Sequence, residues 1–129
     1  MLNQLNHIIE TNFLNFLNEN KFERIDEMSS SLGALVIFKN LEFNIKFVID
    51  RGIVDIEITK SGSSKYYEIS ILEDIYLNSE KFTLKGYKDV LKFLEKNYLW
   101  ILGFFELKNF DSLYYNKLNQ RAKKLFPKL

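Results

Sequence analysis

The sequence predicts an α+β fold in a single domain spanning residues 1–129. Apolar residues recur at helical spacing near the N-terminus, alternate with polar residues between positions 41 and 59, and return to helical spacing after position 86. We therefore expect an N-terminal helix, a four-stranded antiparallel meander and two to three C-terminal helices. These helices should pack on one sheet face, because a sheet with one apolar face needs cover there.

The first helix is predicted from Leu2 to about Glu27. Its apolar stripe recurs at three- and four-residue steps and consists of Leu2, Leu5, Ile9, Phe13, Phe16 and Leu17. The segment Ser29–Gly33 ends it. Because asparagines weaken the intrinsic helix propensity, packing must supply most of the stability of this helix.

A β-hairpin is predicted from strands 41–50 and 54–59, which the turn Asp50-Arg51-Gly52 connects. Opposed residues of an antiparallel pair share a face, so the two apolar sets must match. The pairs that satisfy this condition are Ile49–Val54, Phe47–Ile56 and Ile45–Ile58 on the inner face, with Lys46–Glu57 on the outer face. A shift by one residue would set Phe47 against Asp55 and bury a carboxylate.

Two further strands flank this hairpin in the predicted meander. Residues 34–39 precede it, and their Leu35 and Ile37 point outward together with Val48. Residues 65–70 follow the flexible loop 61–64 and place Tyr66 and Glu68 outward. A short helical turn is expected over residues 71–76.

The C-terminal part is predicted as two longer helices. The first starts at about Gly86, and its second half, around Trp100, is apolar nearly all round. That half is either a central buried helix or a binding surface, through which two copies of the chain could form a homodimer. The last helix begins near Asn109–Asp111 and stops at Pro127.

Composition excludes several classes of site. The chain has no cysteine, which rules out disulfides, thiolate metal sites and a cysteine nucleophile. It has a single histidine, His7, and no glycine-rich phosphate loop. We therefore expect no catalytic residue, no cofactor and no metal, and we expect that the protein is not an enzyme.

The net charge of +1 comes from 18 basic and 17 acidic side chains, and it excludes a strongly basic nucleic-acid binder. A local cluster does occur near the C-terminus: Lys108, Lys117, Arg121, Lys123, Lys124 and Lys128. Without a recognition motif, a solvated helix end is the simpler interpretation. The alternative function is a small nucleic-acid-associated accessory protein that uses this helix.

Outward-facing side chains of the sheet are the candidate partner-binding residues. They are Glu42, Lys46, Asp50, Asp55, Glu57, Tyr66 and Glu68. Three interpretations stay open: a solvated polar face, an acidic patch facing a partner protein, or a carboxylate group for a divalent cation or acid–base chemistry. The outward Leu35, Ile37 and Val48 favour a protein-binding patch, unless a loop or a helix covers them.

The N-terminus has no cationic leader before an apolar run, and the most apolar stretch, 98–105, is too short to span a membrane. We therefore expect a cytoplasmic protein without a membrane partner. Lysine outnumbers arginine 15 to 3, which indicates AT-rich, bacterial coding.

The segment 43–58, with its strand, Asp-Arg-Gly turn and second strand, resembles small bacterial immunity proteins, and residues 66–74 resemble their following aromatic strand and short helix. Such proteins are the cytoplasmic antidotes encoded beside polymorphic or contact-dependent growth-inhibition toxins. The resemblance implies an immunity protein that binds and neutralises a cognate toxin domain. It also implies that an acidic patch would oppose a basic toxin surface.

Overall fold

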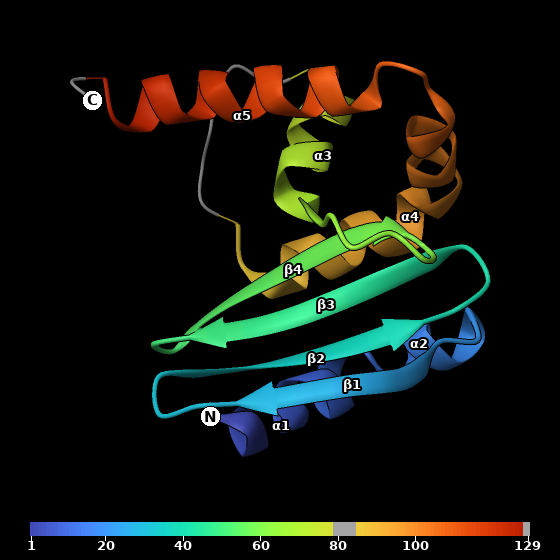
Figure 1. Cartoon of the computed structure of the whole chain (residues 1–129), viewed down its shortest axis with the longest axis vertical. Helices are drawn as coiled ribbons and strands as arrows, with labels where there is room; N and C mark the ends of the chain where they lie inside the picture. The colour runs from blue at the N-terminus through green and yellow to red at the C-terminus, as the bar shows by residue number, and fades with distance from the viewer. Residues whose placement is uncertain (79–84, 128–129) are drawn as a thin grey trace.

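The computed structural model describes residues 1–78 and 85–127, and it has the predicted α+β class. The strands are β1 (Glu23–Ser29), β2 (Gly33–Lys39), β3 (Phe43–Asp50), β4 (Ile53–Lys60) and β5 (Tyr67–Glu68). The helices are α1 (Leu2–Asn12), α2 (Leu14–Glu19), α3 (Ile69–Leu77), α4 (Tyr87–Glu106) and α5 (Phe110–Leu125). All strand pairs are antiparallel, and the order across the sheet is the order along the chain, β1-β2-β3-β4-β5 (Figure 1).

The helices leave one face of the sheet open. In Figure 1, α1 and α2 lie behind β1 and β2, and α4 lies behind β3 and β4. The core between them and the sheet is built on buried phenylalanines: the Phe47 ring packs edge-on against Phe13 at 4.9 Å and against Phe38 at 5.7 Å between centroids. We call the opposite side, which none of the described helices crosses over β1–β3, the open face.

The central hairpin has the predicted register. Ile49 pairs with Val54, Phe47 with Ile56, Ile45 with Ile58 and Lys46 with Glu57. The connection is a two-residue turn in which Arg51 (φ 51°) and Gly52 (φ 86°) both have positive φ. Such turns match the right-handed twist of the flanking strands, which is why a glycine follows the arginine here.

The prediction of a helix up to Glu27 was wrong, and the four predicted strands are joined by a fifth, β1, at the edge of the sheet. Helix α1 ends at Asn12, the short α2 ends at Glu19, and Lys21 with φ 60° reverses the chain into β1. All seven residues of β1 are exposed, so no alternation of apolar and polar residues marks this strand in the sequence. It is held by its ladder with β2, and the segment 29–33 is the hairpin turn between the two strands rather than a helix end.

Two other boundaries differ from the prediction. Leu41 lies in the β2–β3 turn and is 99% exposed, because the Asn40 side chain accepts the backbone N–H groups of Glu42 and Phe43 at 2.9 and 2.8 Å. The strand predicted over 65–70 is only two residues long. Ile69 already begins α3, which takes up the helical turn predicted at 71–76.

The C-terminal helices pack against the β5 side of the molecule. Asp111 in the first turn of α5 accepts the Tyr67 hydroxyl at 2.6 Å and the Lys65 ammonium at 2.8 Å. These two bonds hold the pKa of Asp111 below its usual value. In the apolar second half of α4, Ile101, Phe104 and Phe105 are buried, whereas Leu99 is exposed. Trp100 is half-buried and stacks on Phe104, which favours the interpretation of a packed helix over that of a free surface.

None of the helices in residues 1–78 and 85–127 is both long enough and apolar enough to cross a membrane.

Candidate functional site

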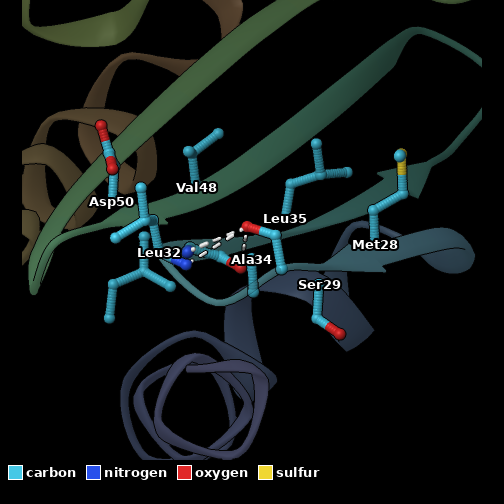
Figure 2. A pocket seen from close by; sticks show the side chains of 10 residues that line it. Met28, Ser29, Leu32, Ala34, Leu35, Val48 and Asp50 are labelled. Atoms are coloured by element: carbon cyan, nitrogen blue, oxygen red, sulfur yellow. Dashed lines mark hydrogen bonds between the residues drawn. The ribbon is translucent and has the colours of Figure 1, made fainter.

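The open face carries a row of apolar side chains at one end of the sheet. Met28 on β1, Leu35 on β2 and Val48 on β3 are directly opposite one another in the strand register. Figure 2 shows these three side chains, with Asp50, on the side of the sheet turned away from the N-terminal helix. Met28 is 63% exposed and Leu35 and Val48 are half-buried, so this row is available to a partner.

These residues line a groove of about 320 Å³. Leu32 in the β1–β2 turn closes its end and is 55% exposed. The turn itself is fixed by the Ser30 hydroxyl, which accepts the backbone N–H of Gly33 at 3.3 Å, while the Ser30 N–H donates to the Gly33 carbonyl at 2.8 Å. The groove therefore has mostly apolar walls on a well-defined hairpin turn.

A charged row crosses the middle of the open face. Lys46 contacts Glu57 at 3.4 Å and lies over the Tyr66 ring at 4.2 Å from its centroid. Glu57 in turn is opposite Glu68 on β5. Of the predicted partner-binding residues, the structure thus brings Lys46, Glu57, Tyr66 and Glu68 together.

Glu68 is the perturbed carboxyl group of this row. Burial and the nearby Asp55 and Glu57 carboxylates raise its pKa, while Arg121 on α5 opposes the rise. The Glu68 backbone N–H donates to the Tyr114 hydroxyl at 3.0 Å, which anchors α5 beside β5. Burial raises the pKa of Tyr114 to about 12. This end of the row is thus shaped by packing against α5.

Asp50 and Asp55 belong to the open face, and Glu42 does not belong to this cluster. Asp55 is opposite Val48, and Asp50 lies on the same face of β3 two residues beyond Val48. Glu42 sits in the β2–β3 turn, where its carboxylate accepts the Tyr98 hydroxyl at 3.1 Å. Its placement on the outer sheet face was therefore wrong, because the Asn40 turn displaces residues 41 and 42 from the strand.

Sequence reasoning missed Met28 and Leu32 as surface residues of this face. Met28 lies in the segment that was predicted as helix, and Leu32 lies in the segment that was predicted to end it. The available signal was the serine-rich turn followed directly by an alternating strand, which is equally typical of a hairpin.

The described residues contain no group of three or more histidine, aspartate or glutamate side chains arranged to hold a metal ion. In the basic C-terminal helix, Lys117 is buried and the Arg121 guanidinium donates to the Ser70 hydroxyl at 3.1 Å. Lys123 and Lys124 are exposed, and Lys128 lies outside the described residues. Nucleic-acid association through this helix stays a prediction.

Comparisons with protein-family models, with curated proteins and with solved structures gave no match for this chain.

Proposed function

We propose that this chain is an immunity protein, which binds and neutralises a cognate bacterial toxin domain through the open face of its sheet. The observation that carries the proposal is the apolar row of exposed Met28 and half-buried Leu35 and Val48, on a face that the described helices leave uncovered. Contiguous apolar surface of this kind on a small domain is typical of protein-binding sites. The resemblance of residues 43–58 to immunity proteins supplies the class of partner.

The neighbouring charged side chains support a protein partner. Lys46, Glu57 and Tyr66 form a connected polar group beside the apolar row, and such groups set the orientation of a complex and reject wrong partners. In this proposal the partner-binding residues are Lys46, Asp50, Asp55, Glu57, Tyr66 and Glu68, with the cytoplasm as the compartment and the toxin domain as the partner. The chain has no catalytic role and needs no cofactor.

The test is to express the toxin domain encoded next to this gene with and without this chain. We expect growth to be restored only when this chain is present, and the two proteins to co-purify as a stable complex. A matched control is the Leu99→Lys variant, which changes an exposed apolar residue of α4 away from the open face and should protect as well as the natural chain. Absence of both rescue and complex formation would sink the proposal.

A further inference from the structure

The groove beside Met28 is small, opens to solvent and is lined mostly by apolar side chains. Its volume of about 320 Å³ is at the small end of the range for ligand sites, and its walls include Met28, Leu32, Leu35 and Val48. Apolar anchors that insert into such recesses contribute a large share of the binding energy of protein complexes.

The rim of this groove is acidic. Asp50 and Asp55 flank Val48, and Asp26 on β1 is opposite Ile37 in the neighbouring row. No ion pair among residues 1–78 and 85–127 involves any of these three aspartates. Lys46, the nearest cation on this face of β3, already contacts Glu57.

Arg51 is a basic residue whose backbone is hydrogen-bonded to Leu32, one of the residues that line the groove. It lies in the β3–β4 turn, and its N–H donates to the Leu32 carbonyl at 3.0 Å. This side of the sheet therefore has three aspartates, of which Asp50 lines the groove, beside Arg51 and a Lys46 that is paired with Glu57. Its local charge is negative although the whole chain has a net charge of +1.

The charge pattern argues against a second copy of this chain as the occupant. A two-fold interface presses the same patch against itself, so the rim aspartates of both copies would approach one another. Placing like charges against one another makes the free energy of association less favourable.

The edge of the sheet argues against an added strand. The ladder between β1 and β2 has a bulge around Ile25, and four of the seven β1 residues are charged: Glu23, Arg24, Asp26 and Glu27. Bulges and charged side chains are the features that keep edge strands from pairing with other chains. The occupant therefore approaches the face rather than the edge.

We propose that the groove receives an aliphatic or aromatic side chain of a partner protein and that lysine or arginine residues flank this side chain on the partner. The apolar walls select the anchor, and the unpaired aspartates select its basic neighbours. The inference rests on the proposed function, since it names the chemistry of the partner surface at the same face.

The probe is a short synthetic peptide with one tryptophan between two pairs of arginines, and its control has glutamates in place of the arginines. Each is titrated into the isotopically labelled full chain, and the backbone amide signals are followed by NMR. We expect the basic peptide to shift the signals of Met28, Leu35 and Val48, with an affinity that falls as salt is added, and the acidic peptide to shift none of them.

Two variants test the two parts of the site separately. Met28→Lys should weaken peptide binding by about tenfold or more, because it places a cation at the apolar anchor. The pair Asp50→Asn and Asp55→Asn should weaken it by about three- to tenfold, because it removes two rim charges. The matched controls are Leu99→Lys and the pair Glu10→Gln with Glu95→Gln, which alter exposed residues of α4 and α1 and should leave binding unchanged.

Equal shifts from both peptides, shifts confined to another surface, or no effect of the Met28 and aspartate variants would overturn the inference. A dimer that Met28→Lys dissociates would also overturn it, because the occupant would then be a second copy. If these variants still neutralise the toxin, the groove proposal fails and the immunity function stands. If the basic peptide binds but no toxin is neutralised, the function fails and the chemistry of the groove stands.

Discussion

Two glycines of this chain should respond to the same substitution with opposite signs. Gly33 opens β2, and a Cβ atom built on it would lie 2.5 Å from the Ile49 carbonyl oxygen on β3. Gly103 lies within α4, and a Cβ atom there would have no neighbouring atom within 4 Å. Gly33→Ala should therefore destabilise the protein, and Gly103→Ala should stabilise it.

The magnitudes follow from these environments. At Gly33 the obstacle is backbone, so β2 and β3 must separate locally and weaken the bond between the Arg51 N–H and the Leu32 carbonyl. Overpacking of this kind costs about 1–3 kcal/mol of unfolding free energy. At Gly103 the alanine gains about 0.5–1 kcal/mol through its higher helix propensity. For a chain of this length, each kcal/mol shifts Tm by about 3–5 °C.

The assay is urea unfolding followed by far-UV circular dichroism, with the natural chain, the two single variants and the double variant measured side by side. The two sites are on different elements, so the double variant should show the sum of the two effects. The reasoning would be refuted if Gly33→Ala left the unfolding midpoint unchanged or raised it. A lowered midpoint for Gly103→Ala would refute the second half.

Three further substitutions test the charged contacts. Glu68→Gln should stabilise the fold at neutral pH, because the pKa of Glu68 is raised in the folded state. The contribution of Glu68 to stability is complete below its unfolded-state pKa and is lost as pH rises through its folded-state pKa. The stabilisation by glutamine should therefore vanish in acid. Asp111→Asn should destabilise the fold at neutral pH, because the pKa of Asp111 is lowered in the folded state. The contribution of Asp111 to stability is present above its unfolded-state pKa and is lost as pH falls through its folded-state pKa. The urea midpoints of the variant and of the natural chain should therefore converge as the pH is lowered. Lys85→Met should lower the free energy of unfolding by about 3–5 kcal/mol, because the Lys85 ammonium is 2.5 Å from the Asp74 carboxylate, whose side chain is only 2% exposed and would stay buried without a cation. The control Lys88→Met removes an exposed lysine and should leave the urea midpoint almost unchanged.

The central hairpin could be predicted from the sequence because burial there is one-sided. Phe47 and Ile56 must share the inner face without burying Asp55, which excludes every shift by an odd number of residues, and the short turn at Arg51 and Gly52 selects the observed register. The contact between Lys46 and Glu57 followed from the same register. Where one face of a strand is buried and the other is exposed to solvent, the alternation of side chains shows which residues face the core, and a short turn then identifies the neighbouring strand.

The edge strand and half of the groove could not be predicted in this way. Strand β1 is exposed on all seven residues, so its stability comes from backbone hydrogen bonds and leaves no hydrophobic pattern. Met28 and Leu32 gain their importance from a neighbour across the ladder or from a turn, not from their own sequence positions. Glu42 was misplaced for a related reason, since the Asn40 side chain decides where β3 begins.

The order of the strands affects how this protein folds during its synthesis. Because spatial order equals chain order, each strand pairs with the one synthesised just before it, and every pairing closes only a short loop. Helix α1, which packs on β2 and β3, precedes all five strands in the chain. All groove-lining residues fall between Met28 and Asp50, so the recess is encoded in the first half of the chain. The groove-lining residues are therefore all synthesised before helices α3, α4 and α5.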